Sequence, residues 1–360
     1  MSRTDGSTYA PDPVPAPVVG PGEFTIAAIG LDHGHIYGQV DGLIGAGAGL
    51  AWVYDPDPRK VAAFAARHPG VRIARSEAEV LDDPAVHLVA GAAVTSERCA
   101  LGIRVMEAGK DYFTDKAPLT TLEQLAAAKD AVARTGRTYA VYYSERLHVE
   151  TAVFASQLIA QGAIGRVLQV IGTGPHRLGT GRPDWFFDKE RYGGILCDIG
   201  SHQIEQILHY TGASDGEVVR SQIANHHHPE HPGLDDFGDA MLVMDNGATG
   251  YFRCDWFTPD GLQTWGDGRT IILGTEGFIE QRKYLQLGDP QSTGGHLYLA
   301  NGQEETAFHL AGEVGYPYFG ELVLDCLNRT ENAMTQEHTF KAAELSVRAQ
   351  LQAVELTGRG

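Results

Sequence analysis

The sequence has few cysteines, no run of basic residues and no long apolar segment. Cys99, Cys197, Cys254 and Cys326 are far apart and form no Cys-x-x-Cys pair, which argues against a disulfide framework or a cysteine zinc site. The chain carries 28 Lys and Arg against 46 Asp and Glu, a formal net charge of −18, so neither nucleic acid nor an anionic membrane is an expected partner. No stretch resembles a signal peptide or a bilayer span. We therefore expect a soluble, cytoplasmic protein with reduced thiols.

Length and composition favour two domains preceded by an arm. A chain of 360 residues with 43% hydrophobic residues can bury more than one core. Residues 1–22 carry five prolines among small and polar residues, a composition that favours extended polyproline-like or disordered chain. Such an arm either has no fixed place or grips a neighbouring subunit.

The first half alternates between short apolar runs and segments with helical spacing. This pattern predicts a parallel sheet flanked by helices, an α/β domain that we place at residues 23–145. The expected strands are 24–29, 50–54, 71–73, 86–93, 112–113 and 139–143, and the expected helices follow Ile36 to Ile44 and lie near 61–65, 100–108 and 122–133.

Two residues in this half are placed to hold a dinucleotide. In a doubly wound sheet, the turn after the first strand binds the pyrophosphate, and an acid ending the second strand binds the adenosine ribose. Gly30 and Asp55 occupy these positions. The acid repels a 2′-phosphate and so favours NAD, although Arg59 and Lys60 keep NADP possible.

The turn itself departs from the usual glycine pattern. It reads Gly30-Leu31-Asp32-His33-Gly34-His35, with Asp32 and His35 at the second and third glycine positions. A carboxylate beside a pyrophosphate is unfavourable unless it points away or caps the helix. We expect Asp32 to cap the helix, and His33 or His35 to face the ligand.

The second half changes to longer strands joined by tight turns. Asp245-Asn246-Gly247 between two of them is typical of a hairpin. We expect an α+β domain with a large, mostly antiparallel open sheet at 146–335, followed by a helical C-terminal segment at 336–360 that packs back on the first domain. The strands are expected at 167–171, 239–244, 249–255, 270–273, 278–281 and 297–299, and the closing helix at 342–356.

Asp198 and His202 lie four residues apart, directly behind Tyr192-Gly193-Gly194. On a helix these side chains share one face, so both can reach one substrate atom. Histidine titrates near neutral pH and a nearby carboxylate can fix its tautomer, which suits general acid and base chemistry. A helix cap beside a packed histidine would give the same spacing.

Lys116 stands just beyond an expected first-domain strand, in Asp115-Lys116-Ala117-Pro118. The carboxyl edge of a parallel sheet is where ligands bind, so Lys116 is placed near a nicotinamide ring. The competing interpretation is a surface lysine.

These motifs together resemble the Gfo/Idh/MocA family, which includes glucose-fructose oxidoreductase and inositol dehydrogenase. The resemblance rests on Asp115-Lys116-Ala117-Pro118 and on the run from Gly193 to His202, in the family's order, and extends from about residue 24 to the C-terminus. It implies a Rossmann domain, NAD or NADP as cofactor, and hydride exchange with a sugar or polyol carbon. It also implies a homodimer or homotetramer formed through the open faces of the second-domain sheets.

The resemblance assigns roles to the polar groups. His202 would be the general base, Asp198 would orient it or share its proton, and Lys116 would hydrogen-bond the reacting oxygen. Asp115 would lie with Lys116 beside the cofactor. The family's Thr-Pro-Asn-x-x-His run is replaced here by residues 93–98, where Thr95 could supply one cofactor hydrogen bond.

Further contacts are predicted from position along the chain. Tyr143 and Arg146 follow the last first-domain strand, and Trp185 precedes the glycines, so all three are candidates for sugar binding beside His202. The histidine-rich run 225–231 suggests a metal, but consecutive histidines cannot all converge on one ion. We expect a solvated or substrate-edge loop there and no metal site.

Three functional classes remain open. The first is an NAD(P)-dependent dehydrogenase or reductase of a sugar, polyol or related secondary alcohol. The second is a glycoside-cleaving hydrolase or lyase that oxidises a sugar carbon transiently with tightly held NAD. The third, a non-catalytic NAD sensor, would be expected to lose the lysine and histidine that are present here.

Overall fold

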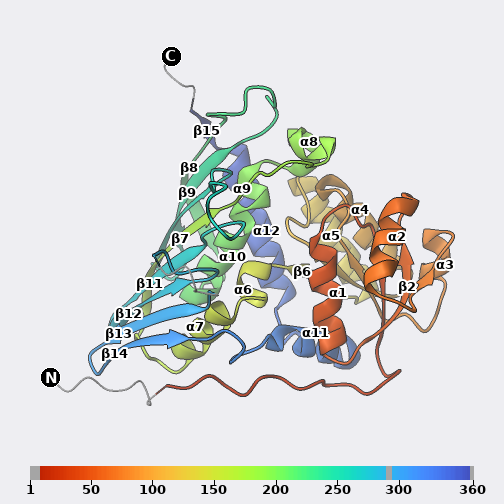
Figure 1. The fold of residues 1–360 in the computed structure, drawn as a ribbon, viewed down its shortest axis with the longest axis horizontal. Helices are drawn as coiled ribbons and strands as arrows, with labels where there is room; N and C mark the ends of the chain where they lie inside the picture. Colours follow the sequence, from red (N-terminus) through yellow and green to blue (C-terminus); the bar gives the residue numbers. More distant parts are fainter. Residues whose placement is uncertain (1–8, 289–293, 357–360) are drawn as a thin grey trace.

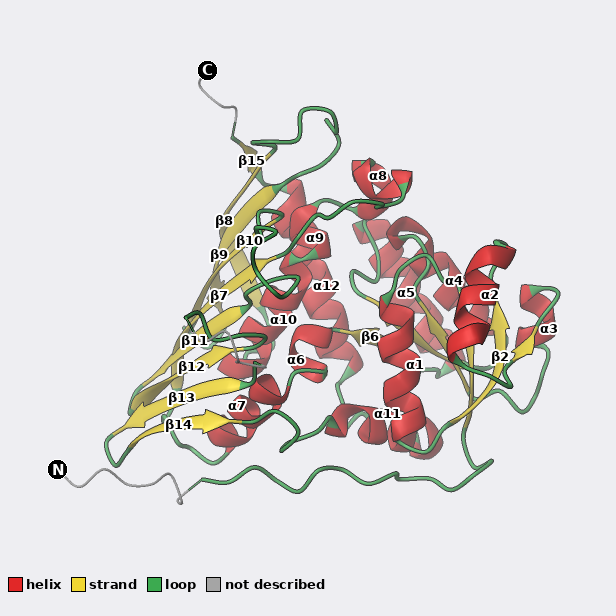
Figure 2. Cartoon of the chain, in the orientation of Figure 1, coloured by secondary structure: helices red, strands yellow, loops and turns green. Residues whose placement is uncertain are grey.

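The computed structural model describes residues 9–288 and 294–356, which form two sheets with helices between and around them (Figures 1 and 2). The first sheet has six parallel strands in the order β3-β2-β1-β4-β5-β6, and the second has nine in the order β14-β13-β12-β11-β7-β10-β9-β8-β15. In the part of the chain described, no helix is both long and apolar enough to cross a membrane.

The first domain confirms the expected alternation of strand and helix. Its parallel strands follow the order of dinucleotide-binding domains, with the ligand crevice outside their carboxyl ends. Strands β4, inside the sheet, and β6, at its edge, are both buried along their length, which explains their continuous apolar sequence. The elements are β1 Thr25–Ile29, α1 His35–Gly45, β2 Gly49–Tyr54, α2 Pro58–Arg67, β3 Arg72–Ile73, α3 Glu77–Leu81, β4 Leu88–Gly91, α4 Thr95–Glu107, β5 Asp111–Asp115, α5 Leu122–Thr135 and β6 Tyr139–Tyr142.

The second domain confirms the open, mostly antiparallel sheet. Two neighbouring strand pairs, β7 with β10 and β8 with β15, are parallel. The strands are β7 Val167–Pro175, β8 Gly216–Ala224, β9 Phe237–Met244, β10 Thr249–Asp255, β11 Arg269–Gly274, β12 Gly277–Arg282, β13 His296–Asn301, β14 Glu305–His309 and β15 Val354–Glu355. The helices are α6 Ser144–Leu147, α7 Glu150–Ala160, the 3-10 turn Asp184–Phe187, α8 Lys189–Tyr192, α9 Ile195–Asp198, α10 Gly200–Thr211, α11 Pro317–Asn328 and α12 Gln336–Leu351.

Helices α10 and α12 lie between the two sheets (Figure 1). Helix α12 contacts α9, α10 and β8 on one side and α5 and β6 of the first domain on the other. The expected closing helix was too long at its C-terminal end, because α12 stops at Leu351 and Val354–Glu355 pairs with β8 instead. The backbone N–H of Leu356 donates to the carbonyl of Ile223, so the chain ends its described part as an edge strand.

The outer face of the large sheet has no covering helix in Figures 1 and 2. Side chains along its strands alternate between buried and exposed, as in a sheet with one covered face. Several exposed ones are apolar: Val219, Met241, Val243, Ile271, Leu273 and Phe278.

The described part of the N-terminal arm lies along the chain's own surface and touches both domains. The N–H of Asp12 donates to Gln157 Oε1 in α7 at 3.2 Å, and the N–H of Val18 donates to the carbonyl of Ala46 after α1 at 2.9 Å. Residues 1–8, the start of the predicted arm, are outside the described residues.

Candidate functional site

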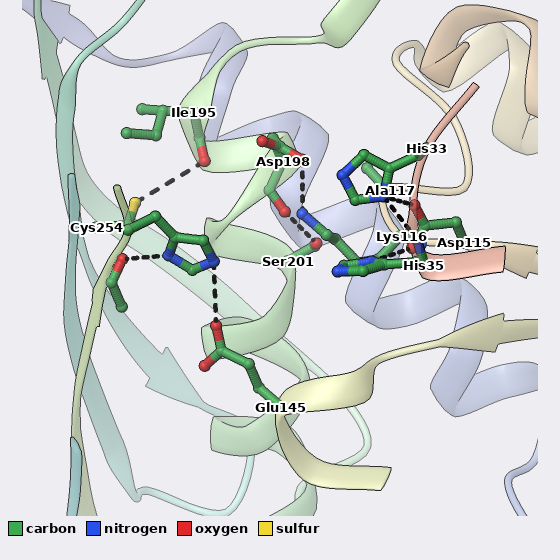
Figure 3. Close-up of polar contacts among 12 residues, drawn as sticks. His33, His35, Asp115, Lys116, Ala117, Glu145, Ile195, Asp198, Ser201 and Cys254 are labelled. Carbon is green, nitrogen blue, oxygen red and sulfur yellow. Dashed lines mark hydrogen bonds and ion pairs between the residues drawn. The ribbon is translucent and has the colours of Figure 1, made fainter. Parts of the chain in front are cut away.

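A cleft of about 350 Å³ lies where the carboxyl edge of the first sheet faces α9 and α10. The three expected catalytic residues, Lys116, Asp198 and His202, all line it, together with His33 and His35. Residues from both domains and from widely separated parts of the chain therefore share one cavity. Figure 3 shows most of these side chains converging from the two domains.

Lys116 and Asp198 form an ion pair across the domain boundary. Lys116 follows the last residue of β5, Asp198 ends α9, and Nζ donates to Oδ1 at 2.6 Å (Figure 3). Both side chains are buried. Burial raises the pKa of Asp198, but the Lys116 ammonium and its hydrogen bond outweigh this and hold that pKa below its usual value. The pair thus presents a desolvated ammonium and an ionised carboxylate to the cleft.

His202 reaches the same cleft from the first turn of α10. Ile199, between α9 and α10, keeps right-handed helical angles, so the expected one-turn relation to Asp198 is retained. The ring is 2% exposed, and its Nδ1 has no hydrogen-bond partner. Burial lowers the pKa of His202 to about 3, so the imidazole is neutral at physiological pH and can accept a proton.

The expected orientation of His202 by Asp198 is wrong. The carboxylate of Asp198 is bound to Lys116 instead, and Nδ1 of His202 has no hydrogen-bond partner among the described residues. The ammonium is the stronger partner because its hydrogen bond to a carboxylate is charge-assisted.

His33, His35 and Asp115 form a second cluster at the edge of this cleft. His33 Nδ1 lies 3.0 Å from Asp115 Oδ2, and His35 Nδ1 lies 2.8 Å from Oδ1 (Figure 3). Burial raises the pKa of Asp115, but His35, Arg98 and His33 together keep it well below the usual value. Because the carboxylate only accepts, the Nδ1 of His35 carries the proton of its hydrogen bond to Asp115, and Nε2 of the neutral ring is then an acceptor. The Nδ1 of His33 also lies 3.4 Å from the backbone N–H of His35.

This cluster has the composition of a metal site, yet its carboxylate is already saturated. Asp115 Oδ1 also accepts the Lys116 N–H at 2.7 Å, and Oδ2 accepts from Arg98 at 3.0 Å. A guanidinium at ligand distance repels a cation, so the geometry favours Asp115 as the group that orients both imidazoles. Burial is the main cause that lowers the pKa of His33 to about 4.

A neighbouring cleft of about 400 Å³ contains Gly30, Asp32 and Asp55, on the other side of the turn. Gly30 has φ +76°, and a Cβ there would stand 2.9 Å from the Cβ of Ala93. Asp55 Oδ2 accepts the N–H of Leu31 at 2.7 Å and so fixes the turn to the end of β2. Gly30 and Asp55 thus lie at the crevice, as the sequence predicts.

Asp32 does not cap α1, contrary to expectation. Gly34 is the N-cap and no side chain bonds there, while Asp32 Oδ1 accepts from Lys60 Nζ at 2.5 Å. The ammonium neutralises the carboxylate that would otherwise repel a pyrophosphate. An uncapped helix N-terminus, a turn without a Cβ at Gly30 and an acid after β2 fit a dinucleotide.

Other predicted positions lie outside the clefts. Thr95 begins α4 and is buried, and Ser96 and Glu97 line the neighbouring cleft instead. Tyr143 is fully buried and its hydroxyl donates to the carbonyl of Thr339 at 3.2 Å. The expectation that Tyr143 faces substrate is therefore wrong.

Arg146 and Trp185 also turn away from the cleft. Arg146 NH2 lies 2.5 Å from Glu205 Oε1 and is part of a buried ion pair. Trp185 is buried against Phe186, with ring centroids 5.8 Å apart, and does not line the cavity. Both expectations of substrate contact are contradicted by this geometry.

Several other residues line the cleft, and their position along the chain did not identify them. Glu145 lies between Tyr143 and Arg146 in the chain and, with Ser144, lines the cavity from the short helix α6. His176 directly follows the last residue of β7, a position that a longer predicted strand would have indicated. The cleft is also lined by Ser144, Glu145, His176, Arg177, Arg182, Trp256 and Trp265.

The histidine-rich loop is held by one buried carboxylate. Asp236 accepts the backbone N–H groups of His226 and His227 at 2.8 Å and contacts His228 Nδ1 at 3.0 Å. His231 stacks on Phe187 with ring centroids 3.6 Å apart. These contacts give the loop a structural explanation.

Two sequence-family profiles match this chain. The profile "Oxidoreductase family, NAD-binding Rossmann fold" matches residues 18–143, and "GFO/IDH/MocA C-terminal domain" matches residues 153–280. The first match covers the whole six-stranded sheet and identifies the N-terminal domain as an NAD-binding Rossmann domain, and the second covers the large sheet from β7 into β12.

Individual proteins agree with these profiles. The crystal structure of a protein from Erwinia carotovora atroseptica has a TM-score of 0.90 and 53% identity over 93% of this chain and 100% of that one. The scyllo-inositol 2-dehydrogenase (NAD(+)) of Bacillus subtilis is 30% identical over 65% of this chain and 66% of its own length. The D-xylose dehydrogenase of Paenarthrobacter nicotinovorans is 29% identical over 40% of this chain and 38% of its own. The matches thus span about two thirds or less of these two curated relatives.

Proposed function

Because this chain belongs to the Gfo/Idh/MocA family of oxidoreductases, we propose that it is an NAD-dependent dehydrogenase or reductase of a sugar or polyol. The observation that carries the proposal is the meeting of Lys116, Asp198 and His202 in one cleft at the carboxyl edge of the Rossmann sheet. The nicotinamide of bound NAD supplies hydride acceptance and donation there.

The charges of the site suit oxidation of a secondary alcohol. A neutral His202 removes the hydroxyl proton, and the Lys116 ammonium stabilises the negative charge that develops on the oxygen. Asp198 holds the Lys116 ammonium in position. His33 and His35, which contact Asp115 and line the same cleft as Lys116, would contact the cofactor, with Gly34 at the helix N-terminus.

The neighbouring cleft that contains Gly30, Asp32 and Asp55 would hold the adenosine half of the cofactor, and we call it the adenosine cleft. Its residues support NAD over NADP. Asp55 is buried directly after β2, where we propose it meets the ribose, and the two nearby cations have carboxylate partners, Arg59 with Asp57 at 2.8 Å and Lys60 with Asp32. Neither is free to hold a 2′-phosphate without losing its carboxylate partner.

The test is a panel of sugars and polyols incubated with NAD or NADP, followed at the absorbance of reduced nicotinamide. Multiple turnovers per enzyme with at least one compound support the proposal. Glycoside cleavage without net formation of reduced cofactor would replace it with the transient-oxidation alternative.

We also propose that the chain forms homodimers or homotetramers in the cytoplasm. The apolar residues on the open face of the large sheet support self-association. All four cysteines are buried and unpaired, which agrees with a reducing compartment. Recovery of the protein as a monomer, or outside the cytoplasmic fraction of its source cells, would contradict these two points.

A further inference from the structure

The buried carboxylate of Glu145 has one oxygen that accepts hydrogen bonds and one oxygen without a hydrogen-bond partner. Glu145 Oε2 accepts from Lys283 Nζ at 2.9 Å and from Gln203 Nε2 at 2.8 Å. Oε1 has no hydrogen-bond partner, although Glu145 is only 2% exposed. A buried polar atom without a partner is costly and commonly marks a ligand contact.

His176 presents a second acceptor to the same place. Its Nδ1 donates to the carbonyl of Gly174 at 3.1 Å, which leaves Nε2 of the neutral ring as an acceptor. Nε2 lies 3.9 Å from Glu145 Oε1, too far for a direct hydrogen bond. Because Glu145 Oε1 and His176 Nε2 both accept hydrogen bonds, neither can satisfy the other, and each needs a donor from another group.

The charges nearby indicate that these donors are neutral. Lys283 is fully buried and paired with Glu145, and its Nζ also donates to Gln206 Oε1 at 2.8 Å. The carboxylate is thus already balanced by an ammonium, so a second cation would be uncompensated. Neutral hydroxyl groups satisfy both acceptors without adding charge.

Aromatic rings line the same end of the cleft. The ring of Trp265 lies 4.3 Å from that of His176, and Trp256 carries a buried Nε1 with no hydrogen-bond partner. Flat apolar faces beside unpaired polar atoms suit a sugar ring, which has C–H faces and hydroxyls at its rim.

We propose that Glu145 and His176 form a diol subsite, which binds two adjacent hydroxyls of the substrate next to the oxidised carbon. This inference rests on the proposed function. Glu145 Oε1 accepts from one hydroxyl and His176 Nε2 from its neighbour. The subsite would select polyhydroxylated rings and determine which carbon faces Lys116 and His202.

The experiment compares D-glucose, its 2-, 3- and 4-deoxy forms, D-xylose and scyllo-inositol in the wild type, Glu145→Gln and Glu205→Gln. Glu205 is the matched control, because it is a buried carboxylate already paired with Arg146 and His338 outside the cleft. In the wild type, loss of a bound hydroxyl should lower kcat/KM by roughly 10- to 100-fold, mainly through KM. Glu145→Gln should lose most of this discrimination, and Glu205→Gln should keep it. Equal discrimination in the wild type and Glu145→Gln overturns the subsite.

A second variant and a second readout keep failure of the subsite distinct from failure of the proposed function. His176→Phe removes the other acceptor without touching the Glu145–Lys283 pair, and should relax selection at the neighbouring hydroxyl if Glu145→Gln does not fold. Binding of the same sugars to NAD-loaded protein is followed by tryptophan fluorescence. Sugar binding that Glu145→Gln weakens supports the subsite even without turnover, whereas absence of both binding and turnover overturns the subsite and the proposed function together.

Discussion

Lys116 Nζ lies 2.6 Å from Asp198 Oδ1, although the two residues are 82 positions apart and belong to different domains. The ammonium that would stabilise an alkoxide is therefore held by a carboxylate from the opposite side of the cleft. This contact makes the catalytic arrangement depend on the docking of the two domains. It also separates the proposed role of Lys116 from cofactor binding, which we propose involves the turn at residues 30–35 and the end of β2.

Replacing Lys116 with alanine should lower turnover far more than cofactor affinity. Loss of one preorganised donor to a developing oxyanion costs about 10²- to 10³-fold in kcat. The dissociation constant for NAD, measured by fluorescence titration, should stay within about twofold of the wild type, since K116A leaves the adenosine cleft intact. Lys129→Ala, at an exposed position on α5, is the control and should change neither quantity. A parallel loss of NAD affinity in K116A would contradict the assignment.

Acid should destabilise the protein before its carboxylates titrate. The pKa values of His33 and His176 are lowered to about 4 and that of His202 to about 3, in each case chiefly by burial, against 6.5 for an unperturbed histidine. Between pH 6.5 and about 5, the unfolded chain binds more protons than the folded one, so the free energy of unfolding rises with pH in this window. Each such histidine contributes a slope of up to about 1.4 kcal/mol per pH unit.

Urea unfolding at several pH values measures this slope. His202→Asn should reduce it by roughly the contribution of one histidine, because the variant no longer has that buried imidazole. An unchanged slope in this variant would show that His202 is protonated in the folded protein in this range.

Asp55 should determine the preference between NAD and NADP. Its carboxylate repels a 2′-phosphate, so Asp55→Asn should shift the ratio of kcat/KM for the two cofactors toward NADP by roughly tenfold. Asp130→Asn is the control, because Asp130 is an exposed carboxylate on α5 that pairs with Arg134 and does not line this cleft. A shift of equal size in both variants would indicate a general effect of charge.

The open face of the large sheet should mediate self-association. A charge introduced there, Ile271→Glu, should lower the mass measured by light scattering to that of the monomer. Leu327→Glu on α11 provides the control, because Leu327 is 41% exposed and Ile271 43% exposed. Retention of the assembly by Ile271→Glu would place the interface elsewhere.

The sequence predicts the first domain well because its signals are local. Continuous apolar strands, helices of regular period and turns with glycine specify the order of elements, and Lys116, Asp198 and His202 stand at the ends or first turns of these elements. The polar strand β8 and the short edge strand β14 were missed, because Glu217, Arg220 and Glu305 break the apolar pattern. Their pairing depends on neighbouring strands that are distant along the chain.

The side-chain partners within the site could not be predicted from the spacing of residues along the chain. Asp198 was expected beside His202 because the two share a helical face, but the stronger partner, Lys116, comes from the other domain. Tyr143, Glu145 and Arg146 are close neighbours in the chain, but the direction of each side chain around the short helix α6 differs. Of the three, Glu145 lines the cleft. Asp32 likewise pairs with Lys60 from α2 rather than with the helix it precedes.

The most direct test follows the hydrogen itself. A sugar or polyol that the panel identifies as a substrate, labelled with deuterium at the oxidised carbon, is incubated with NAD, and the reduced cofactor is analysed by mass spectrometry. Transfer between substrate carbon and nicotinamide predicts one deuterium per reduced cofactor in the wild type, with formation of this product at least about 100-fold slower in His202→Asn. Reduced cofactor without deuterium, or an undiminished rate in His202→Asn, would contradict the account.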